Sequence, residues 1–293
     1  MALRFFCYTS ATQAGGVGLE YDGRFIDLSQ LLGSPFDQPD LTAVIQGGFF
    51  SLEELEDVEE LVKRRGEKAA MPKDWRWSLP VRRPDKVLAM ARNYQAHAEE
   101  FKAQVPEEPI FFAKLAQSLT PHDAPVVIPA WLSTRVDHEV ELAVIIGTTA
   151  KNVLPERALD HVAGYSILND VTARDLQTQD IQNRRPWVRS KSLDTFGPFG
   201  PFVVPKAYVP NPHELDITLK VNGQVRQSSN TAKMIFKIPA VIAAISRYTT
   251  LQPGDVIAMG TPEGVGPVGH GDVMEATIPG LGTLKNAVRA EVS

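Results

Sequence analysis

The pattern of apolar and polar positions divides the chain into two parts of different character. In the first part, the alternating stretch GVGLEYDGRFIDLS predicts a hairpin whose turn lies at 21–24. Leucine and valine recur at helical spacing over 51–68, which predicts a helix that ends near Gly66. The following segment, MPKDWRWSLPVRRPDK, carries three prolines and is typical of a linker. We therefore expect a small N-terminal α/β domain over 1–80 and a second domain over 81–293.

The second part is dominated by short strand-like runs that are separated by turn residues. Asn222-Gly223 predicts a tight hairpin between two of these runs. Helical spacing is limited to about 93–102, 171–183 and 231–249. The mixture indicates a mainly β fold with some helix, an α+β class, because strands and helices do not alternate as a parallel α/β sheet requires. The predicted strands are DKVLAMA, ELAVIIG, GYSILNDVT, FGPFVV, ITLKVNGQV, DVIAMGT and GDVMEATI.

Composition narrows the class of protein. The chain has 293 residues with 43% apolar side chains, which is ample for a core of ordinary size. A net charge of −5 argues against a nucleic-acid partner and against an anionic membrane surface. Cys7 is the one cysteine, so neither a disulfide framework nor a cysteine metal cluster is available. The sequence shows neither a signal peptide nor an apolar run of membrane-spanning length, so we expect a cytoplasmic protein.

Two glutamates stand at the start of the most apolar strand, in RVDHEVELAVIIG over 135–147. Glu139 and Glu141 are two positions apart, so in a strand they point to the same face. Both faces become apolar after Leu142, which indicates a strand buried on both sides. A solvated strand end is the ordinary explanation for such a pair. His138 points to the opposite face and is left out of the site.

Asp170 ends the next predicted strand, in GYSILNDVTARDLQ. An aspartate at such a corner can simply cap the following helix. Alternatively, Asp170, Glu139 and Glu141 bind one divalent cation. Three carboxylates form a hard oxygen site that suits Mg²⁺, with Mn²⁺ or Ca²⁺ as alternatives, and they leave about three of six octahedral positions for water or substrate.

His97 and Glu100 are three positions apart on a predicted helix and therefore share a face. A carboxylate beside an imidazole orients the ring and raises its basicity, as a general base requires. A surface helix with an incidental His–Glu pair is the alternative. The polar, proline-containing segment 101–109 that follows is a candidate lid over a site.

Further polar residues are candidates for substrate contacts. Lys191 precedes a turn-rich segment that leads into a strand, where its ammonium can bind a carbonyl or carboxylate, although a solvated loop lysine is the alternative. Thr261 follows a predicted strand directly and can donate to a ligand. The remaining candidates are Gln177, Lys114 and Arg92.

The glycines of GTPEGVGPVGHG match a dinucleotide-binding pattern in letters only. Gly264, Gly266 and Gly269 have the required spacing, but Pro267 lies among them and a strand follows where a helix is needed. We therefore expect no nucleotide cofactor. The glycines allow tight turns or a close approach of the backbone to a ligand.

Six blocks in order resemble the fumarylacetoacetate hydrolase superfamily, and in particular its bacterial acylpyruvate hydrolase and 2-hydroxyhepta-2,4-diene-1,7-dioate isomerase members. The resemblance runs from about residue 85 to the C-terminus and is much looser before it. It implies a mixed β-sandwich roll that pairs into a homodimer. The blocks are NYQAHAEE, DHEVELAVIIG, GYSILNDVTARDLQ, KSLDTFGPFGPFVV, VNGQVRQSSNT and LQPGDVIAMGTPEGVG.

The resemblance also implies roles and a reaction. The metal ligands fall on Glu139, Glu141 and Asp170. The substrates implied are 2-oxo acids, and the leading hypothesis is hydrolysis of an acylpyruvate to pyruvate and a carboxylic acid. Decarboxylation or tautomerisation of oxaloacetate, isomerisation of a 2-hydroxy-dienoate, and a non-catalytic metal- or acid-binding role are the alternatives. The implied catalytic residues are His97, Glu100 and Lys191.

Overall fold

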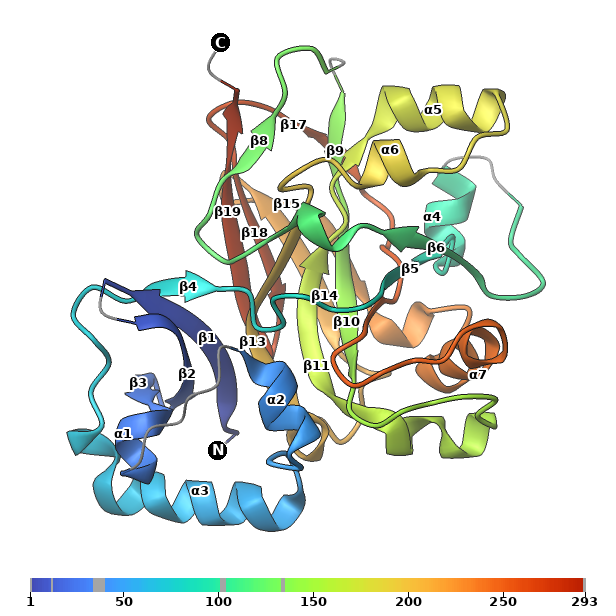
Figure 1. Cartoon of the computed structure of the whole chain (residues 1–293). Coiled ribbons are helices and arrows are strands. Elements are labelled where there is room, and N and C mark those ends of the chain that lie inside the picture. Colours follow the sequence, from blue (N-terminus) through green and yellow to red (C-terminus); the bar gives the residue numbers. More distant parts are fainter. Residues whose placement is uncertain (1, 12, 34–39, 101–103, 133–134, 292–293) are drawn as a thin grey trace.

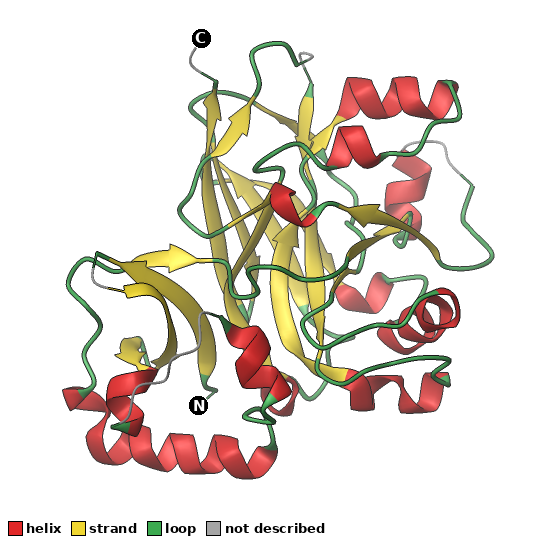
Figure 2. Cartoon of the chain, viewed as in Figure 1, coloured by secondary structure: helices red, strands yellow, loops and turns green. Residues whose placement is uncertain are grey.

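The computed structural model describes residues 2–11, 13–33, 40–100, 104–132 and 135–291. Within them the chain forms three β-sheets, with most helices at the periphery of the strands (Figure 2). The predicted α+β class is confirmed. No helix in these ranges is long and apolar enough to cross a membrane.

The largest sheet joins the N-terminal strands to the centre of the molecule (Figure 1). Its strand order is β3-β2-β1-β13-β11-β10-β16-β5-β6, with β4 on β1 and β7 on β13. Because Phe5 of β1 lies opposite Val203 of β13, the first part of the chain continues the sheet of the second. The strands are β1 (Arg4–Ser10), β2 (Gln13–Tyr21), β3 (Arg24–Asp27), β4 (Arg76–Ser78), β5 (Val87–Ala91), β6 (Ile110–Lys114), β7 (Leu119–Thr120), β10 (Val140–Ile146), β11 (Val162–Asn169), β13 (Gly197–Pro205) and β16 (Val256–Ala258).

Two smaller sheets complete the second part. The five-stranded sheet has the order β15-β14-β18-β19-β8, and the three-stranded sheet has the order β12-β9-β17. The hairpin predicted at Asn222-Gly223 is confirmed, with φ of 52° and 77° at these residues, which is the geometry that Asn-Gly favours. The strands are β8 (Val126–Ile128), β9 (Val136–His138), β12 (Thr172–Ala173), β14 (Asp216–Val221), β15 (Gln224–Asn230), β17 (Gly266–Val268), β18 (Val273–Ile278) and β19 (Gly282–Ala290).

The N-terminal part confirms both of its predicted elements. The hairpin turns at Asp22-Gly23, both with positive φ. The helix α3 (Leu52–Arg65) is capped by Ser51, whose hydroxyl accepts the backbone N–H of Glu54 at 3.3 Å. The boundary near residue 80 stays a prediction. The remaining helices here are α1 (Leu28–Leu32) and α2 (Leu41–Gln46).

Strand β10 is buried on both sides, as its apolar run predicts. Its two faces pack in two different cores. Ala143 and Ile145 belong to the core that contains most of the buried residues of the N-terminal part, whereas the other face belongs to a core formed mainly by the second part. The residues of that other face are Val140, Leu142, Val144 and Ile146. This double burial makes β10 a rigid support for whatever its first residues carry.

Two helices of the second part are shorter than their patterns predict. The helix predicted over 171–183 begins only at Arg174, because β12 pairs with β9 first. The helix predicted over 231–249 begins at Ile238, and the preceding segment contains only a 3-10 turn. The end of the helix predicted over 93–102 lies outside the described residues. The helices are α4 (Gln95–Glu100), α5 (Arg174–Gln182), α6 (Val188–Lys191) and α7 (Ile238–Tyr248).

Candidate active site

Glu139, Glu141 and Asp170 form a buried carboxylate cluster. One oxygen of each lies within 4.8 Å of the other two. Asp170 is not a helix cap, because the residue that precedes α5 is Ala173 and no side chain caps this helix. A solvated position at the end of a strand, the ordinary explanation for the two glutamates, is likewise excluded, since all three side chains are buried. The structure therefore brings together the three residues that the sequence predicts as metal ligands.

The local backbone explains this meeting. Glu139 lies in a break between β9 and β10 rather than inside one strand, which corrects the expectation of a continuous strand. The backbone N–H of Asp170 donates to the carbonyl of Glu139 at 2.8 Å. The N–H of Glu139 donates to Oδ1 of Asn169 at 2.8 Å, and Val140 lies opposite Asn169 in the ladder. These hydrogen bonds join the end of β11 to the start of β10, so Asp170 and Glu139 lie close together.

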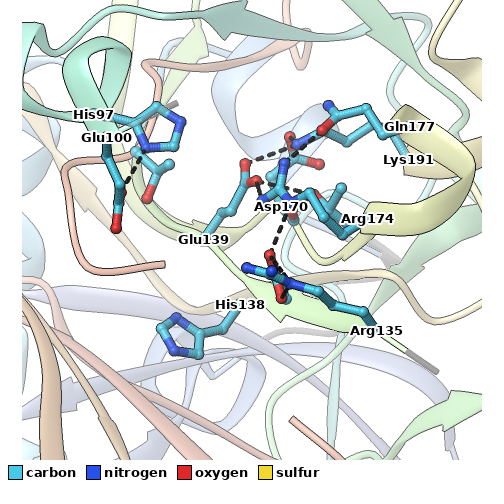
Figure 3. A network of polar contacts seen from close by, with 12 residues as sticks. His97, Glu100, Arg135, His138, Glu139, Asp170, Arg174, Gln177 and Lys191 are labelled. Carbon is cyan, nitrogen blue, oxygen red and sulfur yellow. Dashed lines mark hydrogen bonds and ion pairs between the residues drawn. The ribbon is translucent and has the colours of Figure 1, made fainter. Parts of the chain in front are cut away.

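Basic side chains surround one side of the cluster (Figure 3). Nζ of Lys191 donates to Glu139 at 2.7 Å and to Asp170 at 2.6 Å. Nζ of Lys114 donates to the other oxygen of Asp170 at 3.0 Å and to the carbonyl of Lys191. Arg174 donates to Glu139 as well. Burial alone would raise the pKa of Glu139, but Lys191, Arg174 and His97 overcome it and hold this pKa well below its usual range.

Glu141 has a different environment. It is 1% exposed, and its Oε2 accepts the backbone N–H of Gly260 at 2.7 Å. Burial and the neighbouring charges of Asp170 and Glu139 raise the pKa of Glu141 well above its ordinary value. Without a cation, the ionised form of Glu141 is therefore disfavoured, and no basic side chain among the described residues donates a hydrogen bond to it.

The donor set fits a hard divalent cation. Three carboxylates offer the oxygen ligands that Mg²⁺ and Mn²⁺ prefer, and their burial restricts competition by bulk water. A cation between these oxygens would provide the counter-charge that Glu141 lacks. The residues that would hold it are Glu139, Glu141 and Asp170.

The predicted His97–Glu100 pair is present on α4. Nδ1 of His97 lies 3.5 Å from Oε2 of Glu100, which also accepts the backbone N–H of Gly264 at 3.3 Å. Burial lowers the pKa of His97, against the opposing effect of Glu139. The ring is therefore neutral at neutral pH, the state that a proton acceptor needs. In Figure 3, His97 and Glu100 lie across Glu139 from Lys191.

A cavity of about 260 Å³ opens onto this cluster. Lys114 does not line it, because this lysine lies behind Asp170, and Glu100 is one turn behind His97. His138 is directed away from the cluster, as expected from the sequence, and its Nδ1 lies 3.0 Å from Oε1 of Gln227 (Figure 3). The predicted residues on the wall are Arg92, His97, Glu139, Glu141, Gln177, Lys191 and Thr261.

Arg174 is the main residue that the sequence-based prediction misses. Its Nε donates to the buried Asp137 at 2.7 Å, and its two terminal nitrogens donate to Glu139 and to Gln177. The only available signal was its position four residues after Asp170, at the start of a predicted helix. The prediction also misses an apolar wall of the cavity, formed by Met90, Phe112, Ile181 and Trp187.

Lysine 191 is better defined by the structure than by its sequence context. It ends the short helix α6 and is 2% exposed, which excludes a solvated loop lysine. The candidate lid is described only in part, because 101–103 lie outside the described residues. Residues 104–109 form no helix or strand.

The α+β fold and the carboxylate cluster define a protein with a candidate divalent-metal site beside a basic, histidine-bearing cavity. Residues 86–289 match the model of the fumarylacetoacetate (FAA) hydrolase C-terminal family. The chain therefore belongs to the fumarylacetoacetate hydrolase family.

Known proteins share this second part and, in some cases, the whole chain. An uncharacterized protein of Pyrococcus abyssi is 52% identical over 72% of this chain and 93% of its own length. The human mitochondrial oxaloacetate tautomerase is 45% identical over 71% of this chain and 68% of its own length. The crystal structure of maleylpyruvate hydrolase from Sphingobium sp. SYK-6 in complex with manganese(II) and pyruvate is 33% identical. It covers 99% of this chain and 100% of its own, with a TM-score of 0.79.

Proposed function

We propose that this protein is a metal-dependent hydrolase that cleaves a carbon–carbon bond in an acylpyruvate-type 2,4-dioxo acid. The products are pyruvate and a carboxylic acid. The observation that carries this proposal is the buried carboxylate cluster, of which Glu139 and Glu141 line a cavity that His97 and Lys191 also line. A divalent cation on these carboxylates, Mg²⁺ or Mn²⁺, would polarise the carboxylate and 2-oxo oxygens of the substrate and stabilise an enolate.

His97 is the proposed general base. Its neutral ring can accept a proton from a water molecule, whose oxygen then adds to the C4 carbonyl carbon. The C3–C4 bond breaks, its electron pair forms the enolate of pyruvate, and protonation at C3 releases pyruvate. Glu100, 3.5 Å from Nδ1, orients the ring and stabilises the positive charge that it gains.

Basic and polar side chains would bind the rest of the substrate. Lys191 remains charged beside Glu139 and Asp170, which raise its pKa although burial opposes them. Its ammonium is therefore available to stabilise negative charge that develops on substrate oxygens. Gln177 and Thr261 line the same cavity and offer a neutral amide and a hydroxyl.

The similarity to a hydrolase that binds manganese and pyruvate supports this reaction. A second candidate is tautomerisation of oxaloacetate, which is favoured by the 45% identity with the human tautomerase. Tautomerisation moves a proton but requires no attacking water. Assembly as a homodimer and a cytoplasmic location stay predictions.

The two reactions are separated by their substrates and products, and replacing His97 tests its role in hydrolysis. Purified protein with Mg²⁺ should release pyruvate from an acylpyruvate, measured with lactate dehydrogenase and NADH, and EDTA should stop the release until metal is added back. His97→Asn should lower hydrolysis by at least about a hundredfold, since general-base catalysis contributes about that much.

The matched control is His270→Asn, because His270 is exposed and does not line the cavity. Hydrolysis that is undiminished in EDTA would contradict the proposal. Rapid tautomerisation of oxaloacetate without pyruvate release from any acylpyruvate would select the second candidate. Metal binding with neither activity would favour a non-catalytic role.

A further inference from the structure

The basic side chains on the cavity wall differ in their partners. Lys191 is paired with Glu139 and Asp170, and Arg174 is bonded to Glu139 and to the buried Asp137. Arg92 also lines the cavity, yet no carboxylate in the described part of the chain forms an ion pair with it. Arg92 can therefore pair with a carboxylate of a ligand without breaking an ion pair within the protein, whereas Lys191 and Arg174 already share their charges with protein carboxylates.

The backbone holds Arg92 in an unusual conformation. Its φ is 56°, a left-handed value that is unfavourable for a non-glycine residue. Such a conformation persists only where the surroundings enforce it. Arg92 follows β5 directly, at the point where this strand reaches the cavity.

Hydrogen bonds of the next residue, Asn93, hold this conformation. Its buried side-chain amide donates to the carbonyls of Phe236 at 3.1 Å and Met259 at 2.8 Å. Its Oδ1 accepts the N–H of Phe236 at 2.7 Å, and its carbonyl accepts the N–H of Ile235 at 2.8 Å. Four hydrogen bonds thus fix the residue after Arg92, so the turn that carries the guanidinium is rigid.

Close packing leaves this turn little room to move. A Cβ atom added to Gly260 would lie 2.8 Å from Cβ of Asn93, so the backbone after β16 rests directly against the turn. Other parts of the cavity wall are apolar, with Phe112, Ile181 and Trp187 in it. The cavity combines a carboxylate cluster, an apolar wall and one arginine that has no acidic partner among the described residues.

We infer that Arg92 binds a second carboxylate of the substrate, so that the preferred substrates are 2-oxo acids with a carboxylate at the far end of the carbon chain. The 2-oxo acid end lies at the carboxylate cluster, as in the proposed function on which this inference rests. The intervening carbon chain packs against the apolar wall, and the guanidinium forms a charge-assisted pair with the distal carboxylate.

The inference is tested by binding of two ligands of equal chain length to the Mn²⁺-loaded protein. 2-Oxoadipate has a distal carboxylate and 2-oxohexanoate has a methyl group there. Neither has a C4 carbonyl, so hydrolysis does not interfere. Titration calorimetry should show that the wild type binds 2-oxoadipate roughly tenfold to a hundredfold more tightly, the range expected for a hydrogen-bonded charge.

Arg92→Leu should abolish this preference and leave the affinity for 2-oxohexanoate unchanged. Leucine, like arginine, is not branched at Cβ, so the substitution adds no strain at the positive φ. Arg92→Lys should retain part of the preference, because the charge remains. The inference is overturned if the wild type binds the two ligands equally well or if Arg92→Leu still prefers 2-oxoadipate. It is also overturned if Arg92→Leu loses affinity for both ligands to the same extent.

Kinetics separate this inference from the reaction itself. Pyruvate release from acylpyruvates with and without a distal carboxylate is compared at matched chain length. If the binding preference depends on Arg92 but no acylpyruvate is cleaved, the proposed hydrolysis fails and the inference stands. If both acylpyruvates are cleaved with equal kcat/KM and binding shows no preference, the inference fails and the hydrolysis stands.

Discussion

Glu139 and Glu141 are only two positions apart, but the two sides of the carboxylate cluster on which they lie differ in charge balance. On the Glu139 side, Lys191 and Arg174 donate to the carboxylate and hold its pKa low. On the Glu141 side, a backbone N–H is the hydrogen-bond donor, and burial with neighbouring negative charge raises the pKa. Asp170 lies between the two sides, bonded to both Lys191 and Lys114.

This difference shows how a site can be assembled before its cation binds. The basic side chains keep Glu139 ionised and hold Asp170 in place by hydrogen bonds, while no basic side chain in the described part of the chain donates to Glu141. A protein that used the cluster only for stability would neutralise all three acids, because an unpaired buried charge is costly. The imbalance is therefore best explained by an additional positive charge during function.

The largest effect is expected from Asp170→Asn, which removes the charge that both sides share. Activity should fall by about a thousandfold or more, because metal-held charge stabilisation contributes several kcal/mol to catalysis. Pyruvate release and Mn²⁺ binding are the measurements. Asp175→Asn, five residues further along the chain and outside the cavity, is the control and should keep both. A variant at Asp170 that retained metal-dependent turnover would contradict the role of the cluster.

Opposite changes in stability are expected from the two glutamates in metal-free protein. Glu139→Gln should lower Tm, because it takes a negative charge from Lys191 and Arg174, whereas Glu141→Gln should raise Tm by removing an uncompensated one. Each substitution should change the free energy of unfolding by about 1–3 kcal/mol. Thermal unfolding in EDTA measures it, with the exposed Glu156→Gln as the neutral control. Shifts of the same sign would show that the two sides do not differ.

The smallest effect is expected from Glu100→Gln, at an acid outside the cluster that is partly exposed, at 34% of its side chain. Glutamine can still accept the N–H of Gly264 but cannot stabilise a positive imidazole ring. We expect kcat to fall about tenfold with little change in KM. Glu99→Gln is the control, because Glu99 is exposed and does not line the cavity. Equal losses in the two variants would assign Glu100 a structural role.

Local sequence patterns predicted the elements whose structure depends on near neighbours. The hairpins at 21–24 and Asn222-Gly223 formed because Asp-Gly and Asn-Gly favour positive φ. The double burial of β10 followed from its unbroken apolar run. The helix predicted from residue 171 begins only at Arg174, so this prediction was wrong at its start. Thr172–Ala173 pair with β9 instead, and this pairing depends on a distant strand.

The candidate site shows the same limit. The metal ligands and the His97–Glu100 pair could be proposed from ordered motifs, but Arg174 could not. Its bonds join it to Asp137 and Glu139, which lie 37 and 35 positions earlier in the chain. The left-handed backbone at Arg92 was equally hidden, because it depends on Asn93 bonding to residues 143 and 166 positions away.

By itself, the sequence determined the α+β class, the acidic and histidine-bearing motifs, and the family resemblance, since these depend on local periodicity and residue order. Only the tertiary structure decided which charges are neutralised. The pKa of a carboxylate depends on burial and on charges within a few ångströms, and folding brings those charges from distant segments. The difference between Glu139 and Glu141, two positions apart, is the clearest case of this in the molecule.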